Sequence, residues 1–351
     1  MSEPFKTPVL YIVFNRLQTV VQSFPRIADR RPAQLYLAAD GPRAGREGEA
    51  AACAAVRDYV LSHIDWPCEV HTLFRNENLG CKYGVAGAIQ WFFSNVDAGI
   101  VLEDDILPEP SFFSYCEQML ERYRLNPFVG AVCGFNREGA SSFKDDIFLC
   151  TTVGVWGWAS WADKIGDYSA DYSFLCNAAA SGAGIPAKKR MTRYLSRKAE
   201  AELLSNARRA VEGELNTWDY QFSEYLALRQ MGSVVPRKSL VRNLGFSSDS
   251  THTSGRPSWY KDESWDWGGE IRMPPVIRHN RRYSRLCEAE YVPKMTFRRR
   301  MNRMHDALVA AADRLGLLSL IRWILHHTLK RNHRDSCDCP VSRDAAKEQQ
   351  A

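Results

Sequence analysis

Three consecutive acidic residues, Glu103, Asp104 and Asp105, are the sequence feature best suited to chemistry. They directly follow the apolar run 99–102, which predicts a buried strand. Crowded carboxylates need a cation or hydrogen bonds to offset their repulsion. Mg²⁺ and Mn²⁺ bind a few carboxylates together with phosphate oxygens. The cluster therefore predicts a cation site that grips a phosphate-containing ligand, and the competing interpretation is a solvated acidic loop.

The elements that position these acids alternate between strand and helix in the first half of the chain. Strands are predicted at 9–14, 34–39, 69–74 and 99–102, and helices at 19–28, 49–63, 85–96 and 110–123. This order predicts an α/β fold with a mainly parallel sheet covered by helices on both faces. Ligands bind at the carboxyl ends of the strands in such sheets. Further along the chain, strands are predicted at 129–133, 147–153 and 233–241, and helical structure at 165–215 and 215–229.

The segment 100–107, followed by Phe112-Phe113-Ser114-Tyr115, resembles the metal-binding segment of N-acetylglucosaminyltransferase I and related GT-A glycosyltransferases, including bacterial family 2-like enzymes. Those enzymes use a Glu-Asp-Asp variant of the D-x-D motif. The resemblance implies a GT-A fold, which is a Rossmann-like, mixed and mainly parallel sheet flanked by helices, here with a C-terminal helical appendage. It also implies that Asp105 binds Mn²⁺ or Mg²⁺, with Glu103 and Asp104 as nucleotide-side contacts.

Polar residues follow the first two predicted strands. Asn15 and Arg16 come after the first strand, and Asp40 after the second. The resemblance implies that these loops hold the nucleobase and ribose of a nucleotide-sugar. Turn residues without a ligand are the competing interpretation, and that interpretation is stronger for Asn15 than for Asp40.

The segment 75–84 resembles the glycine-containing stretch that precedes the D-x-D strand in GT-A enzymes. Gly80 would let the backbone approach the ligand. Arg75 and Lys82 could offset phosphate charge.

Glycine and tryptophan alternate at Trp156, Gly157 and Trp158. This stretch resembles the GT-A loop beneath donor and acceptor, so these residues are predicted to contact the acceptor or the transferred sugar, with Trp158 or Trp161 stacking on it. Core packing is the competing interpretation for the tryptophans.

An inverting transferase needs a base for the acceptor hydroxyl. Asp219 fits the family's position at the start of a late helix, but the family has two adjacent acids there, so Glu214 and Glu224 stay open as alternatives. His252, in a polar Ser/Thr/Asp loop, resembles the late histidine that completes the metal shell or closes over the diphosphate.

Composition narrows the partners and the compartment. The net charge of +5 is mild and local, so nucleic acid is not an expected partner. Residues 1–8 lack an apolar signal-peptide core, and no run of about 18 uninterrupted apolar residues occurs. The ten cysteines suit buried thiols in a reducing compartment. We therefore expect a cytoplasmic protein, with the inner membrane face as a peripheral location left open.

Three regions are predicted along the chain. They are a GT-A catalytic domain at 1–270, with a nucleotide-binding half (1–128) and an acceptor half (129–270), a basic amphipathic helical appendage at 271–334, and a disordered tail at 335–351. The appendage suits either contact with an anionic membrane or a helical hairpin packed on the catalytic domain. Membrane contact would suit an acceptor such as a growing lipopolysaccharide.

Together these features predict a metal-dependent glycosyltransferase. We expect it to move a sugar, a hexose or N-acetylhexosamine, from a nucleotide-diphospho-sugar, expected to be UDP-linked, to a hydroxyl of a glycan or lipid-linked glycan, with inversion. One alternative is a sugar-phosphate nucleotidyltransferase, although the glycine-rich loop expected there after the first strand is absent at 14–17. A non-catalytic glycan-binding protein on the same fold is the other.

Overall fold

The computed structural model describes residues 4–137, 145–173, 212–246, 260–268 and 271–291, with a few isolated positions between 199 and 209. The chain divides into two compact units, Met1–Val292 and Pro293–Ala351. All that follows concerns the first unit, since the second lies outside the described residues. The predicted disordered tail and most of the predicted appendage fall in that second unit, and they stay predictions.

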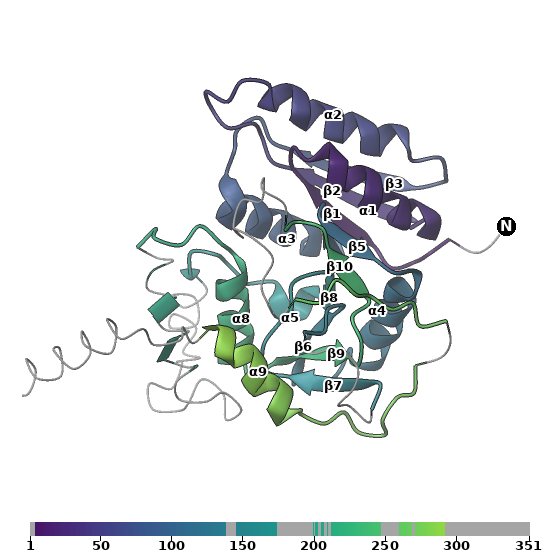
Figure 1. Ribbon diagram of the computed structural model, residues 1–351, viewed down its shortest axis with the longest axis vertical. Helices are drawn as coiled ribbons and strands as arrows, with labels where there is room; N and C mark the ends of the chain where they lie inside the picture. The colour runs from purple at the N-terminus through teal and green to yellow at the C-terminus, as the bar shows by residue number, and fades with distance from the viewer. Residues whose placement is uncertain are drawn as a thin grey trace, which may run out of the picture. The chain divides into compact units, whose positions relative to one another are not determined.

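An eight-stranded sheet with helices on both faces forms the first unit (Figure 1). The helices and strands, in chain order, are β1 (Val9–Val13), α1 (Leu17–Arg30), β2 (Gln34–Ala39), α2 (Glu49–Ser62), β3 (Glu69–Phe74), the π-helical turn η1 (Cys81–Val85), α3 (Ala86–Phe93), β4 (Ala98–Glu103), β5 (Ile106–Pro108), α4 (Pro110–Arg122), β6 (Val129–Cys133), β7 (Ile147–Cys150), β8 (Trp158–Trp161), α5 (Ala162–Ile165), α8 (Asp219–Leu228), β9 (Gly232–Pro236), β10 (Val241–Asn243) and α9 (Arg281–Tyr291).

The strand order of the large sheet is β3-β2-β1-β4-β8-β6-β9-β7. Strands β1 to β4 pair in parallel, as β6 does with β9. β8 runs antiparallel between β4 and β6, and β7 runs antiparallel to β9. The sheet is thus mixed and mainly parallel with helices on both faces, which confirms the predicted α/β class and is consistent with a GT-A fold.

Alternate residues of the central strands enter two separate cores. Val9, Tyr11 and Val13 of β1 pack with α1, α2 and α4, whereas Leu10 and Ile12 pack with α3 and α8. Because neighbouring residues of a strand point to opposite faces, an apolar run without polar interruption is what a strand buried on both faces requires. Helices α1 and α2 lie side by side along one of these faces (Figure 1).

A small second sheet positions the end of the acidic segment. β5 and β10 pair antiparallel, with Asn243 opposite Ile106. The backbone N–H of Leu244 donates to the carbonyl oxygen of Asp105 at 2.7 Å. Residues 243–245 are therefore held directly beside Asp105, although the two segments are far apart in the chain.

Several predicted elements differ from the observed ones. β5 and β8 were not predicted, and the predicted strand 233–241 is two strands, β9 and β10, because Pro236 ends the first. Within 165–215, residues 166–172 and 212–215 form turns and irregular structure, so the predicted helical structure is wrong there, whereas the isolated described positions between 199 and 209 are helical. β8 was not predicted because it is only four residues long and leads directly into the short helix α5.

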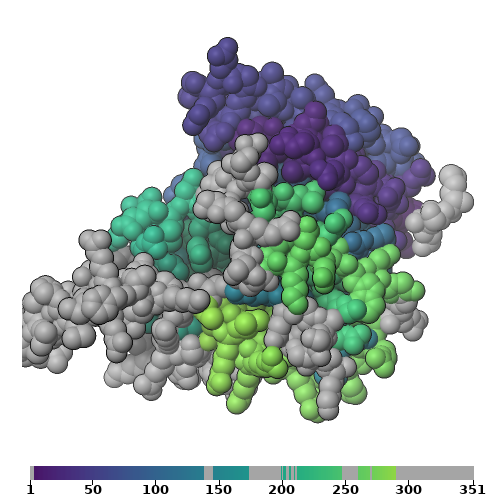
Figure 2. All heavy atoms as spheres, viewed as in Figure 1, coloured from purple at the N-terminus to yellow at the C-terminus, as the bar shows by residue number. Residues whose placement is uncertain are grey.

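Helix α9 belongs to the compact unit that carries the sheet. The ring of Tyr283 packs edge-on against Phe148, with the ring centroids 4.8 Å apart, and its hydroxyl accepts the N–H of Arg137 at 2.9 Å. Residues 260–268 and 271–291, coloured green to yellow, lie on the face seen in Figure 2. The unit therefore continues past residue 270, where the sequence suggested a boundary.

Candidate active site

A cavity of about 420 Å³ opens at the carboxyl ends of β1, β2 and β4. Nine of the predicted site residues line it: Arg16, Asp40, Arg75, Gly80, Glu103, Asp104, Asp105, Trp156 and Asp219. Four others, Asn15, Lys82, Gly157 and Trp158, are not among the residues that line it. His252 lies outside the described residues.

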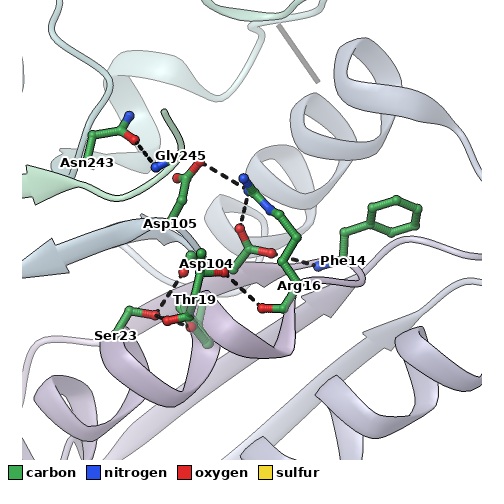
Figure 3. A network of polar contacts seen from close by, with 9 residues as sticks. Phe14, Arg16, Thr19, Ser23, Asp104, Asp105, Asn243 and Gly245 are labelled. Carbon is green, nitrogen blue, oxygen red and sulfur yellow. Dashed lines mark hydrogen bonds and ion pairs between the residues drawn. The ribbon is translucent and has the colours of Figure 1, made fainter. Parts of the chain in front are cut away.

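Arg16 bridges two acids of the triplet (Figure 3). Its Nη2 donates to Oδ1 of Asp104 and, at 3.1 Å, to Oδ2 of Asp105. The backbone N–H of Phe14 donates to the other oxygen of Asp104 at 3.3 Å, and the hydroxyl of Ser23 donates to its carbonyl oxygen at 2.9 Å. The end of β4 is thus tied to the β1–α1 turn and to the first turns of α1.

Burial and the nearby negative charges raise the pKa of both Glu103 and Asp104. Burial raises the pKa of Glu103, and the nearby charges of Asp105, Asp104 and Asp219 raise it further. Burial also raises the pKa of Asp104, while the guanidinium of Arg16 works in the opposite direction. The influence of Asp219 on Glu103 shows that the start of α8 lies within electrostatic reach of the end of β4.

Asp40 organises the backbone that follows β3. Its carboxylate accepts the N–H groups of Leu79 and Gly80, with distances of 2.9 Å and 3.0 Å to Oδ2. Gly80 has φ of +72°, a left-handed backbone that glycine adopts without strain. Gly84 lies equally close, since a Cβ built on it would come 3.0 Å from Oδ2 of Asp40. Asp40 therefore shapes this wall of the cavity as well as lining it.

The two predicted phosphate-binding cations differ in position. Arg75 lines the cavity and donates from Nη1 to the carbonyl oxygen of Gly84 at 3.1 Å. The buried Lys82 does not line it, and its Nζ lies 5.0 Å from the centre of the Tyr83 ring. The backbone N–H of Lys82 donates to Oδ1 of Asn216 at 3.3 Å, which connects this segment to the turn before α8.

Asn15 faces α2. Its Nδ2 donates to Oε1 of Glu49 at 3.0 Å, and Glu49 also pairs with Arg43. In this arrangement Asn15 helps to hold Arg43, which does line the cavity. A direct contact of Asn15 with a nucleotide is thus not supported, and Arg43 is the group on this side that a ligand would meet.

Of the three candidate bases, Asp219 alone lines the cavity. It is the first residue of α8, and its Oδ1 accepts a hydrogen bond from the hydroxyl of Thr217. Glu214 pairs with Arg209 at 3.1 Å on an exposed surface. Glu224 is 1% exposed and accepts a hydrogen bond from the hydroxyl of Tyr172. The geometry therefore favours Asp219 as a group that could touch a substrate.

The tryptophans of the glycine–tryptophan segment lie in two different environments, the cavity wall and the core. Trp156 lines the cavity, with its ring 4.5 Å from Phe135 and 5.6 Å from Tyr260 between centroids. Trp158 is 1% exposed and packs on Phe222 in the core, so no sugar ring can stack on it without opening the core. Trp161, in the same strand, is also fully buried. The core interpretation is correct for these two tryptophans, because β8 is covered on both faces.

Gly157 has a packing role. Its φ is +63°, and a Cβ would come 2.9 Å from Val241 Cγ1. Its carbonyl oxygen accepts the N–H of Gly134 at 2.7 Å. The glycine is thus required by the close approach of β10 to this turn rather than by contact with a ligand.

Asp105 is the residue of the cavity best placed to bind Mg²⁺ or Mn²⁺. No group of three or more His, Cys, Asp or Glu side chains is arranged to hold a metal ion within the described residues. Such ions commonly take only one or two protein carboxylates and complete their shell with water and substrate phosphate. Asp105 lines the cavity and fits that role, with Arg16 on the same carboxylate as its present partner.

Some residues of the cavity wall were not predicted as site residues. Asn216, Thr217, Cys81 and Gly245 line it. The first two directly precede Asp219, and Gly245 closely follows the last strand, so position relative to strand and helix ends was the available signal. Their contacts with β3–α3 and with Asp105 depend on tertiary structure, which sequence spacing does not give.

Comparison with known proteins gives only remote likenesses. No known protein family matches the sequence, and no curated protein sequence matches it. The structure is similar to the glycosyltransferase GlyE of Streptococcus pneumoniae TIGR4, at 10% identity and a TM-score of 0.32 over 65% of this chain. That alignment spans only 45% of the length of GlyE.

Two further structures are similar at the same level. HddC from Yersinia pseudotuberculosis aligns at 16% identity and a TM-score of 0.29, over 48% of this chain and 85% of HddC. Mouse xyloside xylosyltransferase 1 aligns at 9% identity and a TM-score of 0.34, over 64% of this chain and 83% of its own. A shared function does not follow from values this low, so the cavity itself has to carry the functional conclusion. None of the described helices is long and apolar enough to span a membrane.

Proposed function

We propose that this chain is a metal-dependent glycosyltransferase. It moves a sugar from a nucleotide-diphospho-sugar, with UDP as the expected nucleotide, to a hydroxyl of a glycan or lipid-linked glycan, and it inverts the anomeric centre. The observation that carries the proposal is that Asp105 and Asp219 line one cavity at the carboxyl edge of a mainly parallel sheet. One acid can thereby face the leaving group while the other faces the acceptor.

The nucleotide-sugar is expected to lie along the ends of β1, β2 and β4. Asp40 and Arg43 approach the nucleoside from the β2 side, and Arg75 and Arg16 supply positive charge for the diphosphate. Asp105, with the diphosphate oxygens, would hold Mn²⁺ or Mg²⁺, which supplies charge neutralisation for the leaving group. His252 is proposed to complete that region from the loop outside the described residues.

The chemical step is a single displacement. The acceptor oxygen forms a bond to the anomeric carbon as the bond from that carbon to the diphosphate oxygen breaks, and the electron pair leaves with the nucleoside diphosphate. Asp219 takes the hydroxyl proton, and the hydrogen bond from Thr217 keeps its carboxylate oriented. Trp156 offers an apolar ring at the cavity wall for the sugar.

The proposed acceptor follows from the basic C-terminal region of the sequence. A lipid-linked glycan such as a growing lipopolysaccharide suits a protein whose basic C-terminal region docks on an anionic membrane surface. That region lies beyond the described residues, so membrane contact and a cytoplasmic location at the inner membrane face stay predictions.

Binding and turnover of nucleotide-sugars test the proposal. A thermal-shift screen of UDP-, GDP- and dTDP-sugars with Mn²⁺ should give a hit, because a ligand at about 100 times its Kd stabilises the fold by about 2.7 kcal/mol. Wild-type protein should then hydrolyse or transfer from that donor, Asp105→Asn should not, and Asp163→Asn, which alters an exposed ion pair with Arg124, should behave as wild type.

Two results would overturn the proposal. Release of pyrophosphate from a nucleoside triphosphate and a sugar phosphate would identify a nucleotidyltransferase instead. No turnover of any nucleotide-sugar, together with glycan binding that is unaltered in Asp105→Ala, would identify a binding protein.

A further inference from the structure

The guanidinium of Arg16 already occupies the carboxylate proposed to bind a cation (Figure 3). Its Nη2 contacts both Asp104 and Asp105, and the three side chains are only 19%, 3% and 18% exposed. Charges that are shielded from water interact more strongly than charges on the surface. Arg16 thus supplies the positive charge that this pair of acids needs when no ligand is bound.

The start of α1 holds the backbone of Arg16 in place. Its carbonyl oxygen accepts the N–H groups of Thr19 and Val20, both at 3.2 Å, and the hydroxyl of Thr19 at 2.9 Å. The start of α1 therefore anchors the residue. Any movement of the guanidinium away from Asp105 must come from rotation of the side chain alone.

A divalent cation on Asp105 would meet Arg16 at close range. Mg²⁺ lies about 2.1 Å from its carboxylate oxygens. Because Oδ2 of Asp105 is 3.1 Å from Nη2 of Arg16, a cation on that oxygen would be within about 5 Å of the guanidinium. Two positive charges so close in a shielded site repel strongly.

Asp105 has little freedom to avoid this conflict. A Cβ built on Gly245 would come 2.3 Å from Oδ2 of Asp105, so the backbone of Gly245 stands directly against that oxygen. Gly245 is itself held, since its N–H donates to Oδ1 of Asn243 at 2.6 Å. The carboxylate is therefore confined between the guanidinium on one side and the chain after β10 on the other.

We infer that Arg16 is an internal counter-ion that competes with the divalent cation for Asp105 and moves to the donor diphosphate when the cation binds. The inference rests on the cation of the proposed function. The planar fork of a guanidinium matches two phosphate oxygens as well as it matches two carboxylates. One residue would thus offset part of the negative charge of the acid pair in the free protein and hold the leaving group in the complex.

Mn²⁺ binding to the ligand-free protein tests this role without any turnover. Free Mn²⁺ is measured by electron paramagnetic resonance during titration of wild type, Arg16→Gln and Arg16→Lys. Arg16→Gln should bind Mn²⁺ at least about tenfold more tightly, because the competing charge is removed. Arg16→Lys, which keeps the charge but lacks the fork, should be intermediate. Arg124→Gln removes the same charge from the exposed pair with Asp163 and should leave the affinity unchanged.

Melting curves give an independent readout. Arg16→Gln should melt below wild type in EDTA, because the buried Asp104 loses its positive partner, and Mn²⁺ should raise its Tm by more than it raises that of wild type. Equal or weaker Mn²⁺ binding by both Arg16 variants, including no binding at all, would overturn the inference. Failure of the proposed function would be seen separately, as wild-type protein that neither binds nor turns over a nucleotide-sugar.

Discussion

Gly245 stands against Asp105 so closely that a Cβ atom on Gly245 would lie 2.3 Å from Oδ2 of that acid. The two residues belong to segments that pair across the small β5–β10 sheet. Asn243 reinforces the contact, because its Oδ1 accepts the N–H of Gly245. The position of the proposed cation ligand therefore depends on a glycine that lies far from Asp105 along the chain.

Gly245→Ala should displace the carboxylate of Asp105. The added methyl group cannot fit at 2.3 Å, so either the acid or the chain after β10 must shift by about 1 Å or more. Misplacement of about 1 Å at a reacting centre can cost about 100-fold in rate. We expect kcat/KM for the nucleotide-sugar to fall by that order, with weaker Mn²⁺ binding in the same titration.

Gly268→Ala is the matched control, since a Cβ there meets nothing within 4 Å. It should leave both the rate and Mn²⁺ binding unchanged. Wild-type kinetics for Gly245→Ala would show that Asp105 is not confined by this contact.

Asp219→Asn should remove the proposed base while retaining the shape of the side chain. General base catalysis contributes about 10²- to 10⁴-fold, so kcat should fall within that range while the Kd for the donor changes little. Glu214→Gln alters an acid of the same region that pairs with Arg209 on the surface, and it should retain full kcat. Equal losses of kcat in the two variants would indicate a structural effect. Full kcat in Asp219→Asn would show that another group is the base.

The fold class was readable from the sequence because its cause is local. Uninterrupted apolar runs such as 9–13 and 35–39 are typical of strands buried on both faces, and the intervening helical stretches cover them. β8 could not be predicted in this way, because it has only four residues and no hairpin turn signal beside it. Its place between β4 and β6 comes from antiparallel pairing with residues about 25 and about 60 positions away in the chain.

The site residues at the ends of strands could be predicted, whereas contacts between segments far apart in the chain could not. Asp40 and Asp105 follow directly from the rule that ligands lie at the carboxyl ends of parallel strands. The prediction that Trp158 contacts a sugar was wrong. An aromatic residue beside glycine can either stack on a sugar or pack in a core, and the burial of Trp158 shows that it packs in the core. The engagement of Arg16 with the acids could not be read from spacing, since the residues are 88 and 89 positions apart.

Arg57→Met should destabilise the cavity wall, although Arg57 itself does not line the cavity. Nη2 of Arg57 donates to the carbonyl oxygens of Asp40 and Arg75, at 3.0 Å and 2.9 Å, and so ties the ends of β2 and β3 together. Hydrogen bonds from a charged group contribute about 1.5–3 kcal/mol. We expect the free energy of unfolding to fall by about 2 kcal/mol in urea, whereas Arg46→Met at an exposed position should change it little. A loss no larger than that of the control would contradict this role.

Glu224 gives the protein a specific dependence of stability on pH. The side chain is 1% exposed, and burial raises its pKa to about 8, while the hydrogen bond from Tyr172 works in the opposite direction. Between about pH 4.5 and about 8 the unfolded chain therefore releases a proton that the folded chain keeps. The folded state binds more protons in this window, so its stability is fully present below the window and is lost as the pH rises through it.

Glu224→Gln should remove this dependence, because the amide cannot ionise. The free energy of unfolding of the variant, relative to that of wild type, should therefore increase as the pH rises from 5 to 8. The increase should be at most about 1.4 kcal/mol per pH unit. Urea unfolding at several pH values in this range measures the difference, and subtracting wild type cancels the other titrating groups, including Glu103. A difference that stays constant with pH would mean that Glu224 is ionised in the folded protein throughout.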